Sequence, residues 1–92
     1  MIYDIRTLDA AIKALKRLDK PVAKRVISRI QWLAENLDSV EPQPLKENLS
    51  GLYKLRVGDY RVVYRILEEE RMIVVHLVGH RREIYKLFKN ES

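Results

Sequence analysis

The sequence predicts an α+β fold: a small two-layer domain in which an N-terminal strand and an antiparallel helix hairpin pack on a mostly antiparallel four-stranded sheet, with a short C-terminal helix at the end. Two patterns indicate this class. Apolar residues recur at helical spacing between residues 8 and 37, and they alternate with polar residues at strand spacing over much of residues 52–78. At 92 residues the chain has room for one modest core, so we expect a single domain over residues 1–92.

The first half contains one strand and two helices. Residues 1–6 (MIYDIR) predict a short strand, and Thr7 is the candidate N-cap of the helix that follows. Pro21 suits the first turn of the second helix, whose apolar stripe runs to Leu37. Because the loop between the helices is very short, we expect them to form an antiparallel hairpin.

The second half is a loop, three strands and a helix. Residues 38–51 (DSVEPQPLKENLSG) hold two prolines and a glycine without a clear period, which indicates a connecting loop. Strands are expected at about 52–58, 60–68 and 71–78. Gly58 and Asp59 form the turn between the first two, and the apolar run MIVVHLV predicts a central strand that is covered on both faces. A final helix is expected at roughly 81–89.

The positive charge is concentrated in two segments. The net charge of the chain is +5, and residues 52–66 and 79–89 each carry +3, so that the other 66 residues sum to −1. Strand alternation places Lys54, Arg56, Arg61 and Arg65 on one open face, away from the helices. Arg81 and Arg82 follow the end of the third strand and can reach the same face. Such a patch attracts a polyanion, usually nucleic acid, and the alternative is a solvated outer face.

Composition excludes several other classes of protein. The chain has no cysteine, and His76 and His80 have no third ligand nearby, so we expect no disulfide, no metal and no cofactor. His76 is interpreted as a packed strand residue. The sequence shows no apolar run of roughly 18 residues and no signal-peptide pattern, which predicts a cytoplasmic protein with no membrane partner.

The order of these elements and two motifs resemble the RelE/ParE toxin superfamily, in particular its RelE branch. The motifs are LYKLRVGDYRVVY, residues 52–64, and VGHRREIY, residues 78–85. The resemblance covers nearly the whole chain and is nonspecific in the helices. It implies the toxin of a type II toxin–antitoxin system, a metal-independent endoribonuclease that cuts mRNA in the decoding site of the ribosome and inhibits translation. The implied partners are a cognate antitoxin, in an oligomeric complex, and the ribosome with its mRNA.

The resemblance also implies site residues. Lys54, Arg61, Arg81 and Tyr85 match functional positions of the family in residue type, and we take them as candidate catalytic residues. At Arg56 many relatives have a lysine that is taken as the general base. Another branch uses a glutamate in the proline-containing loop together with a histidine near the C-terminus, and the corresponding loop residue here is Gln43, which cannot act as a base.

The chemistry of RNA cleavage assigns the remaining roles. Attack of the 2′-hydroxyl on phosphorus needs a base, charge to stabilise the transition state and an acid. Arg61 and Arg81 suit phosphate oxygens, and Arg56 is a phosphate clamp because arginine holds its proton too tightly to act as a base. Lys54 is a candidate base if neighbouring cations favour its neutral form. The candidate RNA-binding residues are Arg56, Arg65, His80, Arg82 and Lys86.

Three assignments keep a structural alternative. His80 suits acid or base work, or is simply a surface histidine. Tyr85 stacks on a base, or packs the last helix on the sheet. Trp32 is most simply a core or interface residue. Two other functions also stay open, a ParE-type inhibitor of gyrase and a module that binds RNA or the ribosome without cutting.

Overall fold

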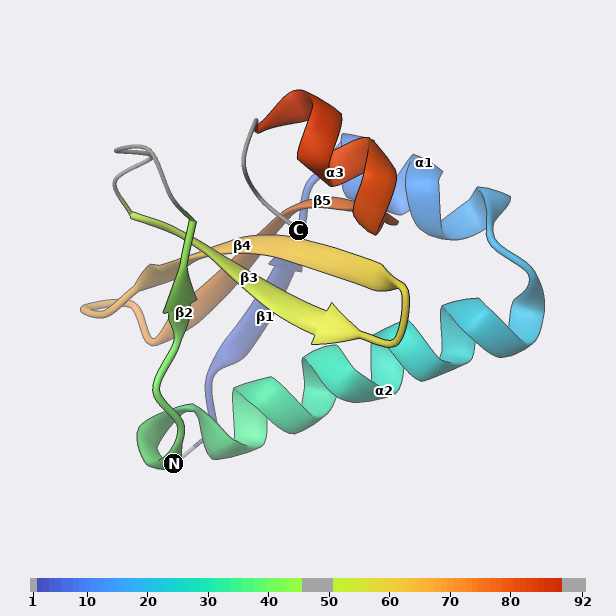
Figure 1. Ribbon diagram of the computed structural model, residues 1–92. Coiled ribbons are helices and arrows are strands. Elements are labelled where there is room, and N and C mark those ends of the chain that lie inside the picture. The colour runs from blue at the N-terminus through green and yellow to red at the C-terminus, as the bar shows by residue number, and fades with distance from the viewer. Residues whose placement is uncertain (1, 46–50, 89–92) are drawn as a thin grey trace.

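The computed structural model describes residues 2–45 and 51–88. The elements in chain order are β1 (Asp4–Thr7), α1 (Asp9–Arg17), α2 (Lys20–Asn36), a short 3-10 helix (Leu37–Ser39), β2 (Gln43–Pro44), β3 (Leu52–Val57), β4 (Tyr60–Leu67), β5 (Met72–His80) and α3 (Arg81–Leu87). The strands form one sheet in the order β1-β5-β4-β3-β2 (Figure 1). β1 runs parallel to β5, and the other neighbours are antiparallel. The α+β class is confirmed.

Two details of the prediction are wrong. The sheet has five strands and not four, because Gln43 and Pro44 in the predicted loop pair with Lys54 and Tyr53. The N-cap of α1 is Leu8 and not Thr7, because the backbone of Thr7 is the last rung of the pairing between β1 and β5. Met1 of the first predicted strand, residues 46–50 of the loop and residue 89 of the last helix lie outside the described residues.

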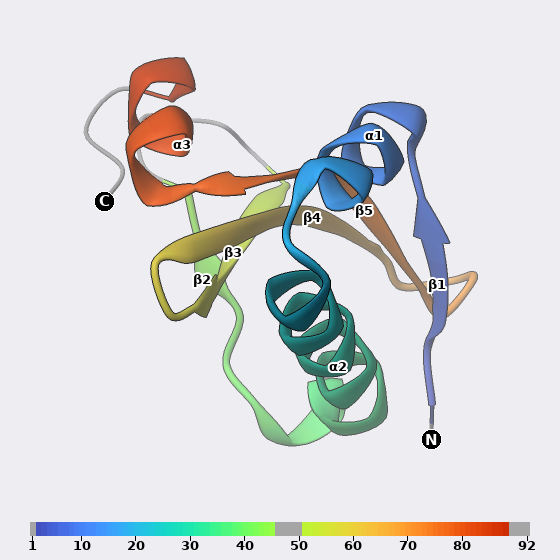
Figure 2. The ribbon, with the colours of Figure 1, turned by 90° about the vertical axis from the view of Figure 1, so that its right-hand side faces the viewer.

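The main core lies between α2 and one face of the sheet (Figure 2). The chain reverses direction between α1 and α2, as the short connection predicted, and α1 packs against β5 (Figure 1). β5 pairs with β1 on one side and β4 on the other, and Ile73 and Val74, which point to opposite faces of this strand, are both buried, as predicted. The largest fully buried side chains of this core are Val26, Val62, Tyr64, Ile73 and Val75.

A smaller core holds α3 on the opposite face of the sheet (Figure 2). Ile84 of α3 is buried with Leu45 and Val63, and the flanking apolar residues are Leu52, Leu77 and Phe88. Val63 faces α3 while its neighbours on β4 face α2, as strand alternation requires. The face that carries α3 is therefore the face on which the sequence placed the basic residues. None of the helices in the described ranges is long and apolar enough to cross a membrane.

Candidate nucleic-acid interface

The β3–β4 hairpin places the basic residues on one face. Gly58 has a φ of +59°, a left-handed conformation that glycine adopts without steric cost, and the tight turn fixes the register. Arg56 stands directly opposite Arg61, and Lys54 stands opposite Val63. This is the register that the alternation predicted. Two arginines that face each other across a strand pair destabilise the hairpin, so the arrangement indicates a role other than folding.

The face is less open than the sequence suggested. Lys54 is 5% exposed and Arg61 is 6% exposed, whereas Arg56 is exposed. The strand pairing gives the reason for Lys54: β3 has β2 on one side and β4 on the other, so this lysine lies between Gln43 and Val63. The prediction that these residues lie on an open face is therefore wrong for Lys54 and Arg61, which are buried.

The guanidinium of Arg61 is fixed by backbone carbonyl oxygens. Its Nη1 donates hydrogen bonds to the carbonyl oxygens of Gly58 and Tyr60, each at 2.9 Å. Burial lowers the pKa of the Arg61 guanidinium, and the charges of Arg56 and Arg81 lower it further, against an opposing effect of Asp59. A guanidinium still stays protonated near neutral pH. The fold therefore holds a positive charge where its surroundings disfavour one, which a bound anion would relieve.

The start of α3 is tied to the hairpin turn. The backbone N–H of Arg81 donates to the carbonyl oxygen of Asp59 at 2.7 Å. His80 caps the helix. Its side-chain Nδ1 accepts a hydrogen bond from the backbone N–H of Arg82 at 3.2 Å, and its backbone N–H donates one to Oε1 of Glu83 at 2.9 Å. These bonds set Arg81 at the turn, near enough for its charge to act on Arg61.

Helix periodicity divides α3 into two exposed stripes and one buried stripe. Arg81 and Tyr85 are four residues apart and share one side, and Arg82 and Lys86 share another. Tyr85 is 50% exposed, while Ile84 is 2% exposed and packs the helix on the sheet. Tyr85 is therefore half open to solvent.

Two of the predicted RNA-binding residues lie apart from Arg61. His80 is the pairing partner of Tyr60, with the rings edge-on at 5.6 Å, and paired residues share a face, so His80 belongs to the face opposite Arg61. Arg65 stands opposite Leu52, four residues along β4 from Arg61, which is about 13 Å at a rise of roughly 3.3 Å per residue. The sequence could not separate them because alternation gives the face and not the distance.

Sequence reasoning missed a cavity at the edge of β3. It has a volume of about 270 Å³, and its lining includes Arg29, Trp32, Glu41, Gln43, Lys54 and Arg56. Trp32 is 39% exposed, and the guanidinium carbon of Arg29 lies 4.5 Å from the centre of its ring. Their spacing of three residues on a helix was the available signal. Within the described ranges no group of three or more histidine or acidic side chains is placed to hold a metal ion.

The sheet order, the helices packed on the sheet and the basic hairpin define a known class of protein. Residues 5–85 match the family model of the ParE toxin of type II toxin–antitoxin systems, so the chain belongs to this family, and its relatives place it in the RelE branch of the RelE/ParE superfamily. Toxin RelG of Mycobacterium tuberculosis is 32% identical over 90 residues, which cover 94% of this chain and 99% of that protein. Toxin RelE of the same organism is 27% identical over 85 residues, with 92% and 88% covered.

Solved structures of this branch have the same fold. The toxin–antitoxin complex RelBE2 from Mycobacterium tuberculosis superposes with a TM-score of 0.78 at 29% identity, covering 88% of this chain and 93% of that one. The archaeal RelE–RelB complex from Pyrococcus horikoshii gives 0.71 at 25% identity, with 88% and 97% covered. Both are complexes of a toxin with its antitoxin.

Proposed function

We propose that this chain is a ribosome-dependent endoribonuclease, the toxin of a type II system that cuts mRNA in the decoding site and so inhibits translation in the cytoplasm. The observation that carries the proposal is the buried Arg61 guanidinium, fixed by two carbonyl oxygens beside Arg56 and Arg81. Preorganised positive charge of this kind stabilises negative charge that develops in a transition state.

The proposed reaction is internal attack on phosphorus. The 2′-hydroxyl of the substrate loses its proton, attacks the adjacent phosphorus and displaces the 5′-oxygen of the next nucleotide, which leaves a 2′,3′-cyclic phosphate and a 5′-hydroxyl. Arg61 and Arg81 stabilise the charge on the phosphate oxygens, and Arg56 holds the backbone. Lys54 is our candidate base, because its amine belongs to the same face of the hairpin as Arg56 and Arg61. Tyr85 stacks on a base or holds the scissile geometry.

The partner that restrains this activity is proposed to be a cognate antitoxin, since the solved relatives include toxin–antitoxin complexes. With its net charge of +5, the chain suits an acidic or amphipathic segment that folds on binding and covers Arg61 and Arg81 or displaces α3. Co-purification with the product of an adjacent reading frame tests this. A stable, non-toxic protein expressed at high level without any partner would contradict it.

The decisive test compares the wild type with Arg81→Ala on translated mRNA, read by primer extension. Arg81 is exposed, so its loss should leave the fold intact while slowing single-turnover cleavage about a hundred- to a thousandfold. Lys20→Ala, which removes an exposed charge at the start of α2, is the control. Cleavage at the wild-type rate by Arg81→Ala would make this face the wrong active site. A module that only binds leaves no cuts, and a gyrase inhibitor acts on DNA topology instead.

Dependence on the ribosome is tested with the same protein. The chain offers charge but only a weak base, and orientation of the substrate can lower a barrier by roughly 7–11 kcal/mol. We therefore expect free mRNA to be cut poorly and mRNA bound to programmed ribosomes to be cut well. Equal cleavage of both would show that the ribosome does not complete the site.

A further inference from the structure

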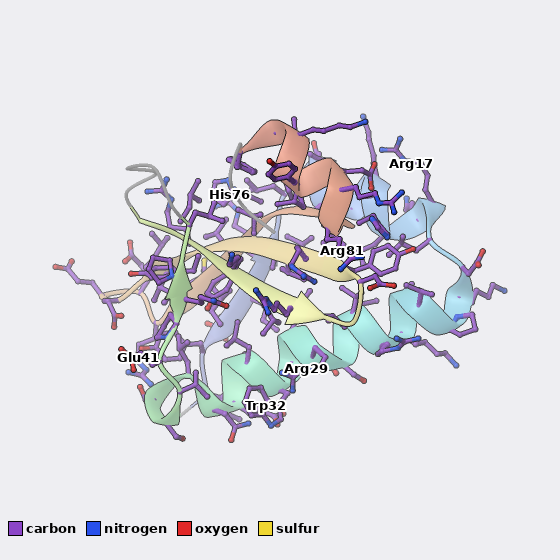
Figure 3. All side chains as sticks on the ribbon, viewed as in Figure 1. Arg17, Arg29, Trp32, Glu41, His76 and Arg81 are labelled. Carbon is purple, nitrogen blue, oxygen red and sulfur yellow. The ribbon has the colours of Figure 1, made fainter. Side chains whose placement is uncertain are left out.

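The cavity at the edge of β3 joins the basic face to α2. Lys54 and Arg56 line it from the sheet. Arg29 and Trp32 line it from α2, and Glu41 from the segment that leads into β2 (Figure 3). Three cations and one carboxylate thus surround an aromatic ring that is 39% exposed. The cavity is not part of the catalytic arrangement proposed above, except that Lys54 and Arg56 belong to both.

The chemistry of this lining favours single-stranded RNA. A guanidinium held over an indole offers planar surfaces on which a base can stack, and nearby cations hold the phosphates on either side. An acidic peptide would satisfy the cations but would leave the aromatic platform without a matching group. The volume of about 270 Å³ is slightly below the range of roughly 300–1,000 Å³ typical of small-molecule sites, which suits one base.

We propose that Trp32 and Arg29 form a base-stacking subsite for a nucleotide that neighbours the one held by Lys54 and Arg56. The inference rests on the proposed function in one respect, namely that Lys54 and Arg56 hold an RNA backbone. It adds that the RNA continues past the edge of β3 to α2. Trp32 is thus a positioning residue that touches the substrate away from the reacting atoms.

Trp32 is the only tryptophan of the chain, so its fluorescence reports on the subsite directly. The probe is a short single-stranded RNA with 2′-O-methyl riboses, which binds but cannot be cut through its 2′-oxygen. Base stacking on the indole should quench the fluorescence as the strand saturates the protein. A matched strand with abasic positions keeps the phosphates and should quench far less. Equal changes with both strands, or no change with a strand that demonstrably binds, would overturn the subsite.

Variants give a second measurement, the anisotropy of the same strand carrying a fluorescent label. Trp32→Leu should weaken binding about fivefold or more, and Trp32→Tyr should restore most of it because a ring is present again. Arg29→Ala should lower the slope of log affinity against log salt by about one. Lys24→Ala is the control, because it removes a charge from the same helix outside the cavity. It should change neither the quenching of Trp32 fluorescence nor the loss of affinity that Trp32→Leu causes. Circular dichroism melts confirm that each variant is folded.

The outcomes separate this inference from the proposed function. The blocked strand requires no chemistry, so quenching by bases supports the subsite even where no cleavage of mRNA occurs. If mRNA is cut efficiently but RNA does not quench Trp32, or Trp32→Leu binds RNA like the wild type, the subsite is refuted and the nuclease proposal stands. Quenching by an acidic peptide and not by RNA would make the cavity a protein-binding surface and the inference wrong.

Discussion

At the scale of single residues, Arg61, which is proposed to act on RNA, has a placement that is unfavourable for folding. Arg61 is buried, its pKa is lowered first by that burial, and it faces Arg56 across the strand pair. Removing one of two like charges that face each other across a strand pair relieves a destabilising repulsion.

Arg61→Met should therefore keep or raise the free energy of unfolding while it reduces cleavage at least a hundredfold. Urea denaturation and single-turnover cleavage on programmed ribosomes measure the two effects. Arg56→Met is the matched control, because Arg56 is exposed on the same face and should contribute little to stability. A loss of more than about 1 kcal/mol in Arg61→Met alone would show that its hydrogen bonds to the turn outweigh its burial.

A substitution at position 56 tests whether the general base acts from this position. Arg56→Lys keeps the charge and places an amine beside Arg61 in the register of the hairpin. If a base acts from this position, the variant should cleave faster than the wild type, most clearly at elevated pH where more of the amine is neutral. If Arg56 only clamps phosphate, the rate should stay flat or fall. A pH–rate profile under single-turnover conditions distinguishes the two.

At the scale of elements, α3 carries Arg81 and Tyr85 but is held mainly by one buried side chain. Ile84 packs with Leu45 and Val63, and a backbone bond to Asp59 fixes the first turn. A helix of seven residues is not stable by itself in water. The position of two candidate catalytic residues thus depends on a very small core.

Ile84→Ala should loosen α3 without unfolding the sheet. Amide hydrogen exchange should show lost protection in α3 and unchanged protection in α2, and cleavage should fall because Arg81 and Tyr85 lose their placement. The cost of such a truncation in a core is about 2–5 kcal/mol. Leu87→Ala, on the same helix and 64% exposed, should change little. Uniform loss of protection across both helices would show that the small core supports the whole fold.

Elements also show what the sequence could and could not predict. Strand alternation and the Gly58 turn were sufficient to place Arg56 and Arg61 on the same face, because both are local properties. β2 was missed because two residues carry no period, and the pairing of Gln43 with Lys54 depends on tertiary contacts. The burial of Lys54 and the cavity under Trp32 were missed for the same reason, since both require the position of the preceding segment against β3.

At the scale of the whole molecule, stability should depend on pH through His76, which lies at an irregularity in the pairing of β4 with β5. His76 is left out of the register between β4 and β5, which passes from Leu77 to Val75, and its Nε2 has no hydrogen-bond partner in the described ranges. Burial, and secondarily the charge of Arg65, lower the pKa of His76. The unfolded chain therefore binds this proton more readily than the folded one.

The direction in which stability changes with pH follows from this difference in pKa. Above the unfolded pKa of about 6.5 neither state is protonated at this residue, and stability is full. As pH falls below about 6.5 the unfolded state gains the proton first, so the melting temperature should drop until the folded pKa is passed. His76→Gln, which cannot titrate, should show a smaller drop in melting temperature between about pH 7.5 and pH 5. Parallel melting curves for both proteins over this range would contradict the assignment to His76.

The pairing of the first strand with the last also bears on how the protein is made. Asp4 pairs with Met72 and Thr7 with Val75, so β1 cannot enter the sheet until β5 has been synthesised. Domains fold from the N-terminus during translation only as far as their contacts allow, and pairings between distant residues form late. Arg81 and Tyr85 follow β5 directly along the chain. A newly made chain thus completes its scaffold and its basic face together, only after β5 and α3 have been synthesised.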